Sequence, residues 1–174
     1  VALADFDGDG FLDAFVANGA FYNYQPNLIW FGDGRGGFVD SGLRLANPER
    51  ATSEAVAVGD LEGDGHLDAF AVNDTANTDD LWLYAGDRSF TNVPVEAGAF
   101  ATDVALGDLD GDGDLDAFVT NRDFQANREL INTQSNEAAP IPTCARPMFL
   151  RRVGLRPLAT VPADGRQGVV QRSP

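Results

Sequence analysis

The sequence predicts an all-β protein made of β-propeller blades, of which the chain holds a partial set. A segment of 18 residues occurs three times without a gap, short apolar runs follow each copy, and Gly, Asp and Asn separate these runs. Short apolar runs between turn-forming residues are typical of β-strands. Four antiparallel strands in a repeat of about 50 residues correspond to one propeller blade.

The repeated segment begins at Val1, Val56 and Val104, so its copies start 55 and 48 residues apart. Each copy contains an apolar run, an acidic Gly-rich loop and a second apolar run that ends in Asn. The strands predicted for the first unit cover residues 1–4, 12–17, 28–31 and 38–39. The repeats show no sustained 3.6-residue period, and we therefore expect no helix in them.

The repeats are expected to occupy residues 1–135, divided at about 1–47, 48–100 and 101–135. Because a propeller closes its ring with about 4–8 blades, these units form a partial propeller. The composition then changes, and residues 136–174 contain six of the 12 basic residues but only two of the 27 acidic ones. We found no strand pattern in this aberrant segment and expect a disordered or poorly packed tail rich in Arg and Pro.

The chain is strongly acidic, with 27 Asp and Glu against 12 basic residues and a formal net charge of −15. Nucleic-acid binding calls for clustered Lys and Arg, so no nucleic-acid partner is expected. The sequence contains no run of about 18 apolar residues, so no insertion into a membrane is expected. The charge favours a cation partner if the carboxylates are clustered, and a solvated surface if they are scattered. The single cysteine, Cys144, excludes an intrachain disulfide and a Cys-rich zinc site.

The carboxylates are clustered, because every copy of the repeat holds acids at positions 1, 3, 5 and 9 of its loop. These acids are Asp5, Asp7, Asp9 and Asp13 in the first loop, Asp60, Glu62, Asp64 and Asp68 in the second, and Asp108, Asp110, Asp112 and Asp116 in the third. Ca²⁺ takes about 6–8 oxygen ligands, and Gly residues between the acids permit the positive φ angles of a tightly curled loop. A backbone carbonyl at position 7 would add a neutral ligand, and these carbonyls belong to Phe11, His66 and Asp114.

Acidic hairpin turns without a metal are the alternative, because Asp-Gly is a common turn sequence. Three copies with the same acid positions favour calcium, since four carboxylates in one loop repel each other unless a cation compensates. We therefore predict about three Ca²⁺ ions, one per repeat. An EF-hand is not expected, because its position-12 Glu is replaced by Val16, Ala71 and Val119.

At these residues the sequence resembles the FG-GAP/VCBS repeat family, whose blades form the head of the integrin α subunit. The acidic loops and residues 31–38 and 84–90 carry the resemblance, which covers about residues 1–133. It is also similar to the N-terminal repeats of cartilage acidic protein. The resemblance implies a seven-bladed propeller, secretion or display at the cell surface, and calcium held by the twelve acids. Glu62 departs from the family pattern, and its longer side chain implies a weaker or water-bridged second site.

Catalysis is not expected. His66 is the only histidine, and Phe11 and Asp114 occupy its loop position in the other units. A unique active site would interrupt the repeat, whereas the acids are copied in every unit. Trp30 and Trp82 are expected to pack in the core rather than to stack on glycans. The favoured function is an extracellular calcium-binding module for adhesion or for binding a protein or glycan, in which calcium clamps each blade. The alternative is the propeller part of a secreted polysaccharide- or lipid-degrading enzyme.

Overall fold

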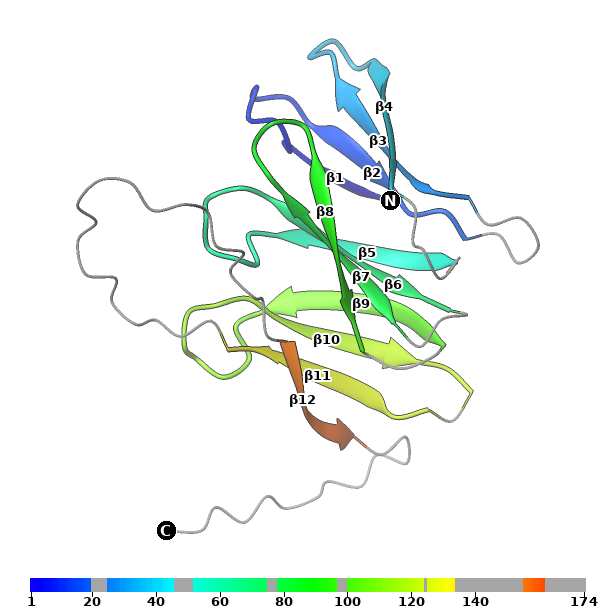
Figure 1. Ribbon diagram of the computed structural model, residues 1–174, viewed down its shortest axis with the longest axis vertical. Helices are drawn as coiled ribbons and strands as arrows, with labels where there is room; N and C mark the ends of the chain where they lie inside the picture. Colours follow the sequence, from blue (N-terminus) through cyan, green and yellow to red (C-terminus); the bar gives the residue numbers. More distant parts are fainter. Residues whose placement is uncertain are drawn as a thin grey trace.

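The computed structural model describes residues 1–19, 25–45, 52–74, 78–96, 100–123 and 125–133, together with the backbone of residues 155–161. Within these ranges the chain forms three antiparallel sheets of four strands and no helix. Figure 1 shows the sheets stacked one upon another along the long axis of the molecule. The predicted all-β class and partial set of blades are therefore confirmed.

Each sheet corresponds to one sequence repeat, and consecutive strands are neighbours in it. Sheet A contains β1 (Ala2–Ala4), β2 (Asp13–Val16), β3 (Asn27–Gly32) and β4 (Phe38–Leu45). Sheet B contains β5 (Ser53–Gly59), β6 (Asp68–Asn73), β7 (Asp79–Tyr84) and β8 (Phe90–Val95). Sheet C contains β9 (Ala101–Gly107), β10 (Asp116–Asn121), β11 (Asn127–Asn132) and β12 (Leu155–Val161).

The four strands predicted for the first unit are present, and β4 runs further than expected. The sequence predicts only residues 38–39, whereas β4 continues to Leu45. The additional residues alternate between exposed and partly buried, as in a strand with one solvent-facing side. The solvent-facing side carries an ion pair between Asp40 and Arg44 (2.7 Å). Because these residues are charged, a search for apolar runs could not find this part of the strand.

The strand β12 is a correction to the expected tail without strands. It pairs with β11 and supplies the fourth strand of sheet C. Pro157 lies within this strand, and Pro is tolerated in an edge strand, where one side of the backbone needs no partner. The rest of residues 136–174 lies outside the described residues, and the boundary at residue 135 stays a prediction.

Two apolar clusters join the three sheets. The cluster between sheets A and B includes Ala4, Phe6, Phe15, Ile29, Ala69, Ala71 and Trp82. The cluster between sheets B and C includes Leu61, Phe70, Val72, Leu81, Val104, Ala117, Val119 and Leu130. Because Ala69 and Ala71 lie in the first cluster and Phe70 in the second, successive side chains of β6 point to opposite faces. Sheet B is thus covered on both sides, which is how blades pack in a propeller.

The first strands of successive sheets are neighbours, with β1 beside β5 and β5 beside β9. The loop that follows each first strand is an acidic loop, and Figure 1 shows the three loops on the same side of the stack. The fold therefore gathers the charged segments of the repeat at one end of the sheets.

A repeated hydrogen-bond pattern closes the opposite end. The second strand of each unit is followed or ended by an Asn whose amide nitrogen donates to a side-chain oxygen at the start of the third strand. These pairs are Asn18 with Asn27, Asn73 with Asp79, and Asn121 with Asn127. Each Asn also donates its side-chain Nδ2 to the carbonyl before that partner, at 2.7 to 3.0 Å. Because this hydrogen-bond pattern is the same in all three units, it defines the start of the third strand in each.

Candidate metal centres

The acid at position 9 holds each acidic loop to its own sheet. All three of these aspartates are fully buried. Their Oδ2 atoms accept the backbone amide at loop position 2, and their Oδ1 atoms accept the amide of the last residue of the third strand, at 2.7 to 3.0 Å. The pairs are Asp13 with Phe6 and Gly32, Asp68 with Leu61 and Tyr84, and Asp116 with Leu109 and Asn132. The sequence predicts these acids only as metal ligands, and it does not reveal the hydrogen bonds that connect the loop to the third strand.

The acids at positions 1 and 5 shape the loop from inside. Asp5 accepts the backbone amides of Gly8 (2.8 Å) and Gly10 (2.9 Å), and Asp9 accepts the amide of Phe11 (2.9 Å). Equivalent bonds run from the Gly at position 6 to Asp60 and Asp108, and from the residue at position 7 to Asp64 and Asp112. Short side chains that accept nearby backbone amides favour tight turns.

The glycines at loop positions 4 and 6 adopt positive φ angles in all three loops, between 67° and 96°. A Cβ atom at any of them would meet nothing within 4 Å. The backbone conformation, and not a lack of space, therefore requires Gly at these positions. The expectation that glycines let the loops curl is confirmed.

Two of the loops bring three carboxylates together. One oxygen from each of Asp5, Asp7 and Asp13 lies within 4.8 Å of the others, and so does one from each of Asp108, Asp110 and Asp112. Oxygens that share one Ca²⁺ at about 2.3–2.6 Å can lie at most about 5 Å apart. The donor set is made of hard oxygens at a spacing that fits this ion, so these clusters could hold a metal.

The third loop offers one more oxygen, which sequence reasoning did not consider. The side-chain Oδ2 of Asp114 is buried and has no hydrogen-bond partner. Burial raises the pKa of this carboxyl, and the charges of Asp112, Asp116 and Asp108 raise it further. Only the backbone carbonyl at this position was predicted as a ligand. The sequence did offer a signal for this additional ligand, because Asp114 is an acid at position 7, where the other loops carry Phe11 and His66.

The second loop differs from the other two. Within the described part of the chain, its acids form no group that meets the same spacing. Burial raises the pKa of Glu62 to about 6, and the charges of Asp68 and Asp64 add to the effect. Burial likewise raises the pKa of Asp68 to about 6, against the lowering effect of its two backbone hydrogen bonds. Burial also raises the pKa of Asp110 in the third loop, so the spacing of the oxygens, and not the pKa, distinguishes the second loop from the other two.

In the first two units, the side chain at position 7 packs against the turn between the third and fourth strands. A Cβ on Gly34 would lie 2.5 Å from the ring of Phe11, and a Cβ on Gly86 would lie 2.9 Å from Nε2 of His66. The His66 ring also makes an edge contact with Tyr84, at 5.7 Å between centroids. His66 thus supports a turn, and the predicted coordination by its backbone carbonyl stays a prediction.

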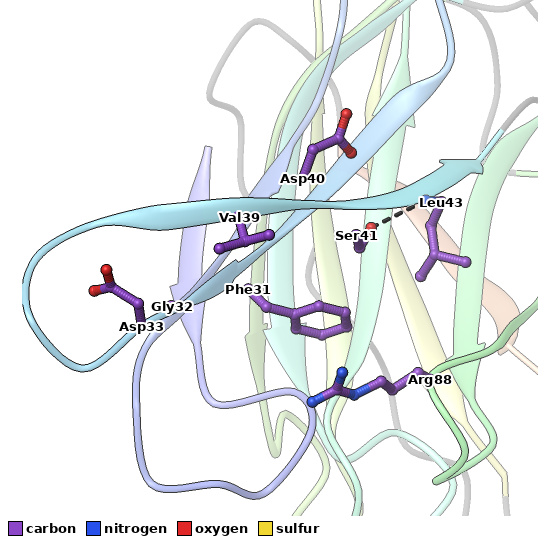
Figure 2. A pocket seen from close by; sticks show the side chains of 8 residues that line it. All are labelled: Phe31, Gly32, Asp33, Val39, Asp40, Ser41, Leu43 and Arg88. Atoms are coloured by element: carbon purple, nitrogen blue, oxygen red, sulfur yellow. Dashed lines mark hydrogen bonds between the residues drawn. The ribbon is translucent and has the colours of Figure 1, made fainter.

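A cavity of about 400 Å³ lies along the β3–β4 hairpin, and Arg88 of sheet B completes its lining. Its lining residues are Phe31, Gly32, Asp33, Val39, Asp40, Ser41, Leu43 and Arg88. Figure 2 shows that Arg88 reaches this region from sheet B and points toward the Phe31 ring. The two acids of the lining are engaged, because Asp33 accepts backbone amides of its own turn and Asp40 pairs with Arg44.

The two tryptophans occupy equivalent positions in β3 and β7. Trp82 is buried in the cluster between sheets A and B, as expected for a core residue. Trp30 is partly buried on the equivalent face of sheet A. In sheet B this face packs against a neighbouring blade, which explains why aromatic residues recur there.

Stacked four-stranded sheets, each with an acidic loop in its first hairpin, define a repeat protein of the β-propeller type. A family model described as the FG-GAP-like repeat matches residues 5–71 and 60–119. The chain belongs to this FG-GAP-like repeat family, which is typically a non-catalytic structural module. No protein of curated function matches the sequence. In the described part of the chain, no helix of the length and apolarity needed to span a membrane was found.

Proposed function

We propose that this chain is an extracellular calcium-binding module for adhesion or for binding a protein or glycan ligand, with calcium as the clamp of each blade. The observation that carries the proposal is that one carboxylate oxygen from each of Asp5, Asp7 and Asp13, at loop positions 1, 3 and 9, lies within 4.8 Å of the others. Asp108, Asp110 and Asp112, at positions 1, 3 and 5 of the third loop, form a second group at the same spacing. Like charges at this distance repel, and a divalent cation removes that repulsion. The FG-GAP-like repeat adds support, since such repeats often bind calcium.

The position-9 acids explain how an ion in the loop would stabilise the whole blade. Asp13 belongs to the first carboxylate cluster and also accepts the amide of Gly32, the last residue of β3. An ion held by this cluster is therefore linked to the first hairpin and to the third strand at once. Calcium that binds only the folded loop stabilises the fold by mass action.

The proposed stoichiometry is about one Ca²⁺ per repeat, with a weaker second site. Glu62 replaces the position-3 Asp of the sister loops, and within the described residues the acids of its loop form no group at the spacing of the other two. FG-GAP repeats are typical of extracellular proteins. Calcium sites of extracellular modules have dissociation constants of about 10⁻⁴–10⁻³ M, so secretion or surface display would keep such loops occupied.

The direct test is equilibrium dialysis of chelator-treated protein against radioactive Ca²⁺, with Mg²⁺ as competitor. The expected result is two tighter ions and one weaker ion per chain, with Mg²⁺ displacing them poorly. A protein that binds no Ca²⁺ at millimolar concentration would refute the calcium role. An array of glycans and matrix proteins, probed with and without EDTA, then tests the ligand-binding role: calcium-dependent retention supports it, and retention of none contradicts it.

A further inference from the structure

Arg88 connects sheet B to the first acidic loop of sheet A. It lies in the turn between β7 and β8, and its Nη2 donates to Oδ2 of Asp7 at 2.6 Å. The Asp7 side chain is only 4% exposed, whereas that of Arg88 is 62% exposed. The guanidinium also lies over the ring of Phe31, with Cζ 4.6 Å from the centroid (Figure 2). The positive charge of Arg88, from sheet B, thus lies against Asp7, one of the three clustered carboxylates of sheet A.

The backbone conformation of Arg88 indicates that contacts of its side chain favour Arg over Gly at this position. Its φ angle is 62°, in the left-handed region that non-Gly residues rarely adopt. The equivalent turn of sheet A closes with the same hydrogen bond, Asp33 to Gly37 in place of Ala85 to Ser89, and carries Gly36 with φ 88° at this point. A strained backbone persists where surrounding contacts favour the residue. At Arg88 these contacts are the ion pair and the Phe31 ring.

We propose that Arg88 is a cross-blade cation that stands in for part of the calcium charge at Asp7 and lowers the calcium affinity of the first loop. This inference rests on the proposed calcium role. In the absence of calcium, Arg88 reduces the repulsion between Asp7 and its neighbours. When calcium binds, the ion and the guanidinium compete for the same carboxylate, because like charges so close repel each other.

The surroundings leave the guanidinium an alternative position. The cavity beside Phe31 has a volume of about 400 Å³, and Asp33 and Asp40 are in its lining. Figure 2 shows Arg88 at the edge of this cavity, with the Phe31 ring directly beside it. A guanidinium that releases Asp7 can therefore keep its aromatic contact with Phe31 and move into the space of this cavity. Within the described residues, neither Glu62 nor Asp110 at the same position of the other loops makes an ion pair, so competition of this kind is specific to the first loop.

The test uses the full chain with the other two loops weakened by Asp64→Asn and Asp112→Asn, which keep the side-chain acceptors of the turns. Arg88→Gln is then introduced, because Gln removes the charge and leaves a non-Gly residue at the same φ angle. We expect calorimetry to show Ca²⁺ binding about three- to tenfold tighter than in the parent. Arg35→Gln is the control, since Arg35 lies in the sheet A turn and makes no ion pair within the described residues.

A second readout separates this role from a purely structural one. Arg88→Gln should lower the melting temperature more in EDTA than in saturating Ca²⁺, because the charge substitution matters only to the metal-free loop. Unchanged or weaker Ca²⁺ binding in Arg88→Gln would overturn the inference while the proposed function stands. If the parent with an intact first loop binds no Ca²⁺, both are overturned.

Discussion

The side-chain Nδ2 of Asn132, at the end of β11, donates a hydrogen bond of 2.8 Å to the backbone carbonyl of Leu61, in the acidic loop of sheet B. The backbone amide of Asn132 meanwhile donates to Asp116, the position-9 acid of its own sheet. One buried residue therefore joins the second and third acidic loops. Together with Arg88, which joins sheet B to the first loop, it places the loops at the junctions between blades.

Asn132→Leu should destabilise the fold because it removes the side-chain bond between sheets B and C. Leaving a buried carbonyl without this donor is expected to cost about 1–3 kcal/mol of the free energy of unfolding. Urea denaturation followed by tryptophan fluorescence measures the change. A matched control is Thr102→Ala, because Thr102 donates to Thr120 at the exposed side of the same sheet. Equal losses in both variants would argue against a special role for the junction.

Asp13→Ala and Asp9→Asn should separate folding from metal binding in the first loop. Asp13 is buried and accepts two backbone amides, so its removal is expected to cost about 2–4 kcal/mol even in saturating Ca²⁺. Asp9 is exposed, and Asn keeps an acceptor for the Phe11 amide. Asp9→Asn should therefore unfold like the parent in EDTA and differ from it only in Ca²⁺. Thermal melts in the two buffers distinguish the variants, and a similar loss in EDTA for both would contradict the assignment.

The repeat made most of this architecture accessible from sequence. Strand positions, curled glycine loops and the clustering of acids follow from local patterns that occur three times. Contacts between units could not be read in this way. The ion pair of Arg88 with Asp7 spans 81 residues, and the tie of Asp13 to Gly32 depends on the register of β3. The strand β12 was missed because it lies on an edge and contains Pro157, where local propensity is a poor guide.

Glu62→Asp should restore a stronger second calcium site. The equivalent residues, Asp7 and Asp110, belong to three-carboxylate clusters, whereas the longer Glu62 does not within the described residues. The shorter Asp side chain at position 3 would place its carboxylate oxygen where Asp7 and Asp110 have theirs in the other two loops. We expect about a three- to tenfold tighter second site by calorimetry, in line with the effect of ligand charge and rigidity on calcium affinity. Glu54→Asp, at an exposed position of β5, is the control, and identical isotherms for both variants would count against the geometry.

Asp79→Asn should change how stability depends on pH. Asp79 is buried, one of its oxygens accepts the Asn73 amide, and the other has no hydrogen-bond partner. Burial raises its pKa to about 7, and the charge of Asp80 adds to the effect. Because the folded pKa exceeds the unfolded one, the folded state binds a proton more tightly. The native fold is therefore stabilised as the pH falls from about 7 toward 4, and the penalty for the charged carboxylate is complete above pH 7.

The sister blades indicate what the substitution will do. Asn27 and Asn127 occupy the position of Asp79 in sheets A and C, and they accept the same backbone amide at 2.9 and 3.0 Å. Asp79→Asn should thus raise the free energy of unfolding by about 1–3 kcal/mol at pH 8. The gain should shrink as the pH approaches 5, where the wild-type carboxyl is protonated. Urea titrations of both proteins between pH 5 and 8, in EDTA, measure the difference; curves that stay parallel over this range would show that Asp79 is not the group responsible.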